Sequence, residues 1–396
     1  MTRERRGPPS PLPHSVRLLG WVSLLTDAAT EAVYPLLPVF ITEVLGGPPV
    51  TIGVVEGAAD ATSSILKIVS GRWSDRLNRR KPLAVAGYAL SSAVRPFVAL
   101  ATSWGHVFAI RVIDRMGKGI RGAPRDAMLA ALSPPGERGR VFGYHWGMDH
   151  AGAAVGPLLA TVFLWFAPDN YRMLFGLTII PGALAVLTLL KVPDVEVIAP
   201  PSTTAAPPAP SHLRTLAPLP PPLKRYLGVM SIFTLGNSSD AFLLLQLSNA
   251  GAPLMGLTVL WSAQHAIKAL LSIKGGMLSD RLGRRTLIIG GWLIYAVVYA
   301  GFAWSTSLAA LVAWFLIYSV YASAVEGSEK ALIADLTPQP LRATAFGWHA
   351  AVQGVGALAA SLLFGAIWQY FGAPTAFITG AGLALAAAAL LAIARV

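Results

Sequence analysis

The sequence predicts an all-α membrane protein in which twelve transmembrane helices form two pseudo-symmetric six-helix bundles, and three observations support this prediction. The 396 residues are 54% hydrophobic and 13% charged, with a mean hydropathy of +0.58, whereas a soluble domain carries about 25% charged residues. The apolar residues fall into runs of about 20, the length of helix that crosses a bilayer. One basic phrase lies between two such runs in each half of the chain, which indicates an internal duplication.

The apolar runs give the position of each helix in order. The predicted spans are 17–41, 51–71, 83–102, 105–132, 141–166, 173–192, 225–247, 254–275, 286–304, 308–333, 343–369 and 374–394. Gly and Pro within them do not exclude a helix, because membrane helices tolerate both. The first span carries Asp27 and Glu31 and is too long for the core of a signal peptide, so we expect it to be retained.

The segment between the sixth and seventh spans is rich in Pro, Ala, Ser and Thr. This composition favours an extended linker, because it offers little apolar surface to bury. The chain therefore divides into four predicted parts. They are an N-terminal tail at 1–16, an N-terminal bundle at 17–192, a linker at 193–223 and a C-terminal bundle at 224–396.

Lys and Arg gather in alternate short loops. The segments 76–81 and 281–285 are strongly basic, whereas 46–49, 103–105 and 305–307 contain no Lys or Arg. Because basic residues concentrate in cytoplasmic loops, we expect both termini, the linker and the basic loops to face the cytoplasm. The same bias explains the net charge of +12 without a nucleic-acid partner.

The basic phrase reads G-R-W-S-D-R-L-N-R-R at 71–80 and G-M-L-S-D-R-L-G-R-R at 276–285. The repeat extends beyond the loops, because F-G-Y-H at 142–145 matches F-G-W-H at 346–349. With this motif after the second and eighth spans, twelve spans and a long central linker, the chain resembles the major facilitator superfamily over nearly its whole length. The resemblance implies transport by alternating access, a place in a bacterial inner membrane, and a loop that latches one state on the cytoplasmic side.

The resemblance assigns this gating to residues of both phrases. They are Gly71, Asp75, Arg76, Arg79, Arg80, Gly276, Asp280, Arg281, Arg284 and Arg285. Each Asp can accept hydrogen bonds, and each Arg cluster can bind acidic groups or helix C-termini of the facing half. Asn78 stands where the second copy has Gly283. Because Asn is the next-best residue for a left-handed turn, we expect this departure to cost little.

The fifth span resembles a motif of family members that export by antiport. The matching residues are Gly143, Gly152, Gly156 and Pro157, and the match is partial because 160–161 reads Ala-Thr where the motif has a Gly pair. Small residues also allow close helix packing, and Pro removes a helix hydrogen bond. Packing alone is therefore an alternative explanation of the pattern.

Several charges lie at mid-membrane depth, where each costs about 2.5–3.5 kcal/mol unless it faces a cavity or a partner. The residues predicted to carry proton coupling or to line a central cavity are Asp27, Glu31, Asp60, Arg111, Asp114, Arg115 and Asp149. A carboxylate beside a cation stays ionised, and loss of that cation favours protonation. We therefore expect Asp27 and Glu31 to carry protons, with Arg111 as their switchable partner. The alternative is a static salt-bridge network that holds the spans together.

His145 and Asp149 have the spacing of metal ligands on one helix face, yet the chain has 0 Cys and no His cluster in a loop. We therefore expect neither a metal site nor a cofactor. The motifs of serine hydrolases, metalloproteases and nucleotide-binding loops are also absent from the sequence, so an enzyme is not expected.

The leading hypothesis is proton-coupled export of a small solute by antiport. The alternative is proton-coupled uptake of an organic anion, which the Arg and Lys residues of the fourth span would clamp. Lipid flipping and metal efflux rank below both. The expected partners are a small-molecule substrate, protons and the lipid bilayer, and we expect a monomer. The substrate is not predicted, because apolar membrane sequence encodes the shape of a cavity poorly.

Overall fold

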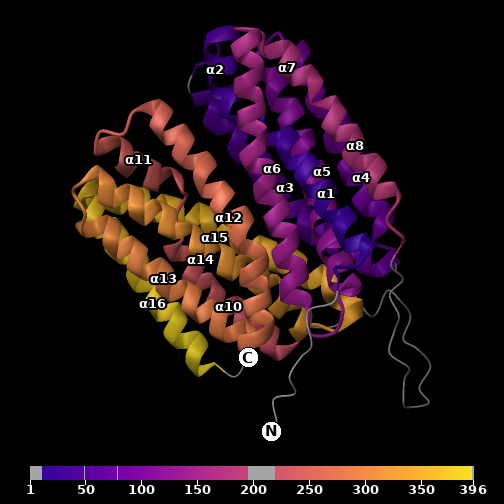
Figure 1. Ribbon diagram of the computed structural model, residues 1–396, viewed down its shortest axis with the longest axis vertical. Coiled ribbons are helices and arrows are strands. Elements are labelled where there is room, and N and C mark those ends of the chain that lie inside the picture. Colours follow the sequence, from indigo (N-terminus) through magenta and orange to yellow (C-terminus); the bar gives the residue numbers. More distant parts are fainter. Residues whose placement is uncertain (1–10, 49, 78, 195–218, 395–396) are drawn as a thin grey trace.

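The computed structural model describes residues 11–48, 50–77, 79–194 and 219–394, and nearly all of them are helical (Figure 1). The N-terminal bundle consists of α1 (His14–Glu31), η1 (Tyr34–Leu36), α2 (Leu37–Val39), η2 (Phe40–Val44), α3 (Val50–Leu77), α4 (Lys81–Val94), η3 (Arg95–Leu100), α5 (Trp104–Leu132), α6 (Arg138–Phe166), α7 (Tyr171–Leu177) and α8 (Ile179–Leu190). The C-terminal bundle consists of α10 (Pro221–Gly236), α11 (Ala241–Asn249), α12 (Leu254–Leu282), α13 (Arg284–Trp304), α14 (Leu308–Leu336), η4 (Gln339–Leu341), α15 (Arg342–Phe371) and α16 (Ala373–Ile393). Each predicted span coincides, to within a few residues, with one helix or with consecutive helical segments.

Two spans depart from regular α-helix in ways that shape the interior. Beyond Glu31 the first span continues through short 3-10, α and π segments to Val44, where Pro35 and Pro38 remove backbone donors. The seventh span is interrupted between α10 and α11, and residues 237–240 are not helical. Such irregular backbone is tolerated at membrane depth only where it is buried in protein or lines a cavity.

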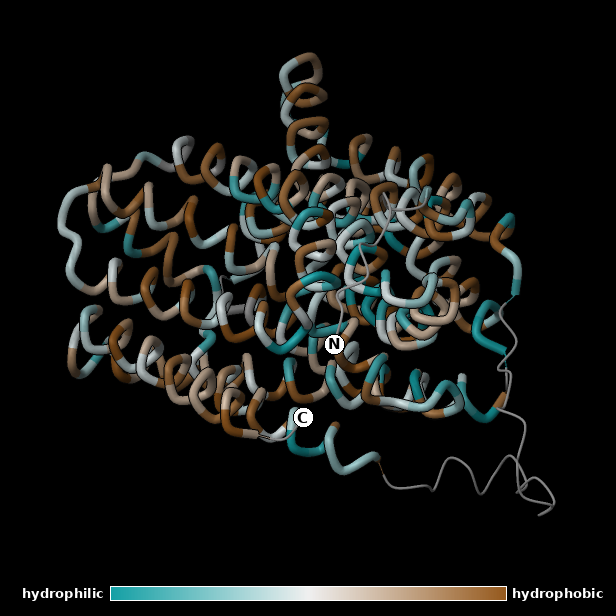
Figure 2. Tube along the Cα trace, turned by 60° about the horizontal axis from the view of Figure 1, so that its bottom comes forward, coloured by the Kyte–Doolittle hydropathy of each residue, from teal (hydrophilic) through white to brown (hydrophobic). Residues whose placement is uncertain are grey.

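Most of the spans are apolar enough to cross a membrane. Nine helical spans in the described part of the chain meet that description by length and composition. The other long helices, α3, α5 and α12, carry charged residues within their length, and Figure 2 shows hydrophilic residues interrupting the hydrophobic helices. A charge inside a membrane helix must face a partner or a cavity, so these three helices direct attention to the site.

The two bundles meet at the end where α1 begins and α16 ends, and they diverge toward α7 and α11 (Figure 1). We call these the closed end and the open end. Across the bundles α3 packs on α15, and α6 packs on α12. A Cβ on Gly71 would overlap the carbonyl oxygen of Ala343. A Cβ on Gly276 would overlap the backbone of Gly139. The glycine of each repeated phrase therefore makes one backbone contact with the opposite bundle.

The structure corrects one boundary predicted from the sequence and bears on one turn. Helix α10 begins at Pro221, inside the predicted linker, and residues 195–218 lie outside the described residues. Gly283 has φ 95° and ψ 142°, close to a region open essentially only to Gly and unlike the left-handed turn that Asn favours. The expectation that Asn78 costs little stays a prediction, because position 78 lies outside the described residues.

Candidate transport site and gates

A cavity of about 840 Å³ lies between the two bundles. Helices α3 and α5 line one side, and α10, α12, α14 and α15 line the other. The interrupted segment at 237–240 forms part of its wall. Cavities of about 300–1,000 Å³ bind drug-sized molecules, so this central cavity has room for a small organic solute.

A smaller cavity of about 220 Å³ adjoins the central one. Its wall includes Asp27 and Asp149 of the N-terminal bundle. Lys67, Lys118 and Gln353 line both cavities. These three residues therefore mark the junction through which a bound solute and the acidic residues of α1 and α6 can influence each other.

Asp27 on α1 and Asp149 on α6 line the same small cavity, close enough for their side chains to form a hydrogen bond, and we call them the carboxyl pair. Two carboxyl groups can share such a bond only when one of them carries a proton, because an ionised carboxylate is an acceptor alone. Ser23 also donates its hydroxyl to Asp149. Lys118 and Arg121 supply positive charge from α5. The arrangement of the two carboxyl groups therefore suits the sharing of one proton.

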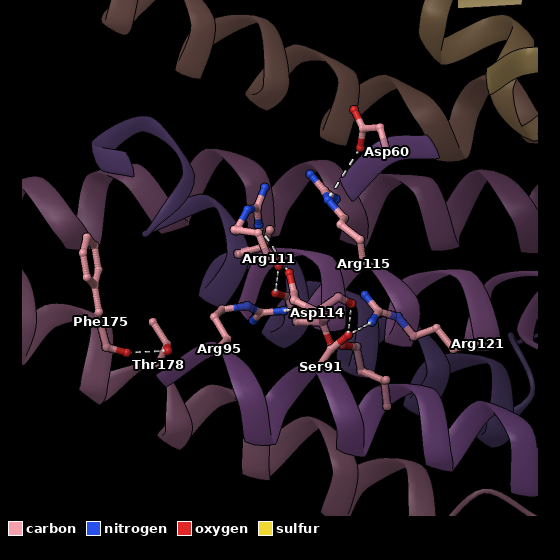
Figure 3. Close-up of polar contacts among 12 residues, drawn as sticks. Asp60, Ser91, Arg95, Arg111, Asp114, Arg115, Arg121, Phe175 and Thr178 are labelled. Carbon is pink, nitrogen blue, oxygen red and sulfur yellow. Dashed lines mark hydrogen bonds and ion pairs between the residues drawn. The ribbon is translucent and has the colours of Figure 1, made fainter. Parts of the chain in front are cut away.

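A network of buried charges lies between α5, α3 and η3 (Figure 3). Arg111 donates to Glu56 at 2.8 Å and to Asp114 at 3.3 Å. Asp114 also accepts from Arg95 at 3.0 Å, and its main-chain carbonyl accepts from Ser91 at 2.8 Å. Each of these charges is partnered, so the network ties α5 to its neighbours.

The partners of Arg111 differ from the sequence prediction. The structure joins Arg111 to α3 and to its own helix rather than to Asp27 and Glu31, because its guanidinium faces α3. Asp27 bonds to the opposite carboxyl group on α6. Glu31, the last residue of α1, interacts electrostatically with the cations of α5 without a direct ion pair to a described residue. Arg111 therefore makes no direct ion pair with Asp27 or Glu31 in this conformation, and the predicted switch stays a prediction.

Asp60 and Arg115 occupy the wall toward the central cavity. Arg115 Nε lies 3.6 Å from Asp60, and Arg115 Nη2 lies 3.8 Å from Glu56. Asp60 is exposed and lines the central cavity. Figure 3 shows Asp60 on α3 directed at the guanidinium of Arg115 on α5. This contact is looser than the buried network behind it.

Two polar contacts cross between the bundles beside the cavities. Lys330 donates to Asp126 at 2.5 Å. His150 of α6 contacts Glu326 at 2.8 Å and His265 at 3.2 Å. Asp126 thus pairs with Lys330 of the opposite half as well as with Arg125 of its own helix. Both contacts must separate if the bundles move apart here.

At the closed end, Asp75 caps the start of α15 in the opposite bundle. Its carboxylate accepts from the N–H groups of Thr344 at 2.7 Å and Ala343 at 3.3 Å, and from the Thr344 hydroxyl at 2.8 Å. The N-terminus of a helix carries partial positive charge, which favours a carboxylate there. Arg80 lies 3.9 Å from Asp75 and donates to the carbonyl of Gln339 in the opposite bundle at 2.8 Å.

Asp280 makes the equivalent contact in the second half. It accepts from the N–H groups of Arg140 at 2.8 Å and Gly139 at 3.0 Å, at the start of α6. Arg284 forms an ion pair with Asp280 and lies 3.1 Å from Asp335. Each repeated phrase therefore places one Asp on a helix N-terminus of the opposite bundle.

The other basic residues of the two phrases have different surroundings. Arg285 donates to the carbonyl of Leu391 at 2.9 Å, near the end of α16. Arg76, Arg79 and Arg281 are exposed. The contact between the bundles therefore depends on the two Asp residues, the glycines and part of each Arg cluster.

The glycines of α6 lie at close helix contacts. A Cβ on Gly143 would overlap a backbone carbonyl of α12. A Cβ on Gly152 or Gly156 would overlap a backbone carbonyl of α1. Pro157 is buried within α6. Packing accounts for these glycines, so their spacing adds no independent sign of the direction of transport.

Sequence reasoning did not single out Arg95 or Asp335. Arg95 is the one Arg within the third predicted span. A lone charge in an apolar run indicates a buried partner or a cavity, so the sequence could have identified this residue. Asp335 receives Arg138 from one bundle and Arg284 from the other. That meeting depends on how the bundles dock, which no local pattern encodes.

Two helical bundles around a central cavity, with equivalent contacts at one end, define a class of secondary transporter. The family model of the Major Facilitator Superfamily matches residues 19–267 and 245–396, and the chain belongs to this family. An uncharacterized MFS-type transporter of Methanocaldococcus jannaschii, MJ1317, is 32% identical over 391 residues, covering 96% of this chain and 94% of that protein. The multidrug resistance protein MdtH of Photorhabdus laumondii is 31% identical over 144 residues, covering 36% of each chain.

Solved structures agree with the predicted fold. A bacterial homologue of the iron transporter ferroportin in the outward-facing state has a TM-score of 0.76 at 15% identity, covering 96% of this chain and 99% of that one. The human organic anion transporter MFSD10 has a TM-score of 0.71 at 18% identity, covering 96% of this chain and 100% of that one. These likenesses concern the fold alone, and they confirm the prediction of an all-α protein with two six-helix bundles.

Proposed function

We propose that the protein is a proton-coupled secondary transporter of a small solute, in which the carboxyl pair Asp27 and Asp149 carries the coupling proton. Membership in the family supports transport. The observation that carries the coupling is the meeting of two carboxyl groups, Asp27 and Asp149, in the wall of a cavity that shares Lys67 and Lys118 with the solute cavity.

We infer that the closed end faces the cytoplasm, because the basic loops lie there and basic loops concentrate on that side. The conformation described above is then open to the outside. Opening to the cytoplasm requires the Asp75 and Asp280 contacts to break, together with the Asp126–Lys330 pair. Both members of the carboxyl pair belong to the N-terminal bundle and travel together, so the pair can carry its proton from one side to the other.

The network around Asp114 has a supporting role in this proposal, because its charges are already partnered within one bundle. Export by antiport, the predicted direction, draws support from the similarity to a multidrug resistance protein over 36% of the chain. Uptake of an organic anion together with protons draws support from the two lysines at the junction. We propose that the carboxyl pair carries the coupling proton whether the solute is exported by antiport or taken up together with protons.

A two-stage experiment tests the proton carrier. A thermal-shift screen of the purified protein against metabolites, drugs and metal salts at two pH values first provides a ligand. The same ligand is then followed in proteoliposomes. Asp27→Asn is expected to retain exchange of ligand across the membrane but to lose accumulation driven by a pH gradient, because the amide cannot release a proton. Glu43→Gln, at an exposed carboxylate of the same span, serves as the control. Gradient-driven accumulation by Asp27→Asn at the wild-type rate would refute the assignment.

A further inference from the structure

We propose that Lys67 and Lys118 bind an anionic group of the transported solute, a carboxylate or a phosphate, at the junction of the two cavities. This inference rests on the proposed transport function and names the chemical class of its substrate. The apolar part of the solute would lie in the central cavity, whose wall includes Phe233, Tyr318 and Tyr321. Aromatic side chains provide a large apolar contact surface for such a group.

The two lysines reach the same space from different helices. Lys67 comes from α3 and Lys118 from α5, and both line both cavities. A Cβ on Gly122 would lie 3.6 Å from Cε and Cγ of Lys67, so the stem of Lys67 lies against α5 at a residue without a side chain. Gly122 is about one helical turn from Lys118. The backbone of α5 therefore guides both ammonium groups to the junction.

Neither ammonium group forms a hydrogen bond or an ion pair within the part of the chain that the structure describes. The other charges of the two walls are engaged. Their contacts are Asp60 with Arg115, Asp126 with Arg125 and Lys330, Asp240 with Lys268, Glu326 with His150, Glu329 with His349, Arg121 with Ser91, and Asp27 with Asp149. Two ammonium groups in a confined space, neither in a direct ion pair with a described residue, favour an anion, and Lys binds phosphate and carboxylate as a compact point charge.

The size of the smaller cavity agrees with this assignment. Its volume of about 220 Å³ accommodates a carboxylate or phosphate group with a few waters, since a water occupies about 30 Å³ in the liquid. The central cavity of about 840 Å³ holds the rest of the molecule. The anion would thus lie at the inner limit of the solute site, next to the carboxyl pair.

A bound anion would change the proton affinity of the carboxyl pair. Lys118 and Arg121 of α5 supply positive charge to Asp27, while Arg125 of α5 and His145 of α6 face Asp149. An anion on Lys118 weakens this positive field and favours protonation of the pair. By linkage, the proton then strengthens the binding of the anion by the same factor. An anionic solute would therefore move in the same direction as the proton.

Ligand-dependent thermal stability of the purified full-length protein tests the proposal. The anionic probes are benzoate and phenyl phosphate. The neutral probe is benzyl alcohol, and the cationic probe is benzylammonium. Dihexanoyl phosphatidylglycerol represents a lipid headgroup. The anionic probes are expected to raise the melting temperature most, and more strongly at the lower of two pH values. Lys67→Gln and Lys118→Gln should each raise the half-saturating concentration about tenfold, because each removes a charged hydrogen-bond donor. Lys118→Arg should retain binding, and Lys224→Gln, at an exposed lysine, should change nothing.

Three results would overturn the proposal. They are stronger stabilisation by benzylammonium than by benzoate, anion binding by the double Lys67→Gln and Lys118→Gln variant at the wild-type concentration, and no anionic probe exceeding benzyl alcohol. Binding of the phosphatidylglycerol through both lysines, without binding of benzoate, would identify the anion as a lipid headgroup. The melting temperature of each ligand-free variant shows whether it has folded.

This test and that of the proposed function can fail separately. Loss of gradient-driven flux in Asp27→Asn, together with probe binding that ignores both lysines, would uphold proton coupling and refute the anion site. Lysine-dependent binding of benzoate, together with full gradient-driven flux in Asp27→Asn, would uphold the anion site and refute the proton carrier.

Discussion

The two bundles share a backbone plan but fill it with different chemistry. Helices α5 and α14 occupy equivalent places in the repeat, so Asp114 corresponds to Tyr318 and Arg121 to Val325. All four residues are buried. The same position in the fold therefore holds a charge in the first bundle and an aromatic or aliphatic side chain in the second.

The difference continues through the two interiors. In the second bundle Tyr295 stacks on Tyr299 with ring centroids 4.1 Å apart, and Phe233 stacks on Trp292 with centroids 4.6 Å apart. Aromatic packing buries apolar area and leaves few groups to satisfy, whereas buried charges depend on one another. Under the proposed function, we expect the first bundle to respond to protons and charge and the second to form a more rigid wall.

The largest expected difference in stability comes from the corresponding pair Asp114 and Tyr318. Asp114→Asn should lower the free energy of unfolding by about 3–5 kcal/mol, because it leaves Arg95 and Arg111 buried without a full counter-charge. Tyr318→Phe removes one hydrogen bond to Asp240 of 2.8 Å and should cost about 1–2 kcal/mol. Thermal unfolding of the purified variants measures both. Equal losses would remove the distinction between the two interiors.

The closed-end contacts test the symmetric part of the comparison. Asp75→Asn and Asp280→Asn each weaken hydrogen bonds between a carboxylate and a helix N-terminus, so each should shift the equilibrium toward opening of the closed end by about 1.5–3 kcal/mol. Distances between spin labels placed on the two bundles at the closed end measure the populations of the closed and opened conformations. Arg79→Gln, at an exposed residue of the same phrase, is the control. A shift in only one of the two Asp variants would show that the contacts are not equivalent.

The smallest expected effect concerns the one position where the two phrases differ in turn chemistry. Gly283→Asn should destabilise the protein by about 1–2 kcal/mol, because φ 95° with ψ 142° is unfavourable for any side chain. Thermal unfolding of this variant beside Gly283→Ala provides the measurement. A melting temperature equal to that of the wild type for Gly283→Asn would indicate that the loop can adopt a second turn.

The sequence predicts the architecture well, because local patterns of residues determine where the helices lie. Apolar runs gave the spans, and the repeated phrase singled out Asp75 and Asp280, which both meet the opposite bundle. In this conformation Arg111 contacts Glu56 and Asp114 rather than the acids of α1. The sequence could not predict these contacts, because depth along a helix fixes height in the membrane but not the direction in which a side chain points. The bond between Asp27 and Asp149 joins α1 to α6, and its geometry depends on the packing of those helices.

The central claim is that the proton acts through the first bundle, and one distance tests it most directly. The chain has 0 Cys, so single cysteines at Thr102 and Thr306, exposed at the open ends of the two bundles, can carry spin labels without background. The distance between the labels is predicted to change with pH in the wild type and in Asp240→Asn, which alters a carboxylate of the second bundle, and to be independent of pH in Asp27→Asn. A pH response that persists in Asp27→Asn and disappears in Asp240→Asn would contradict the account.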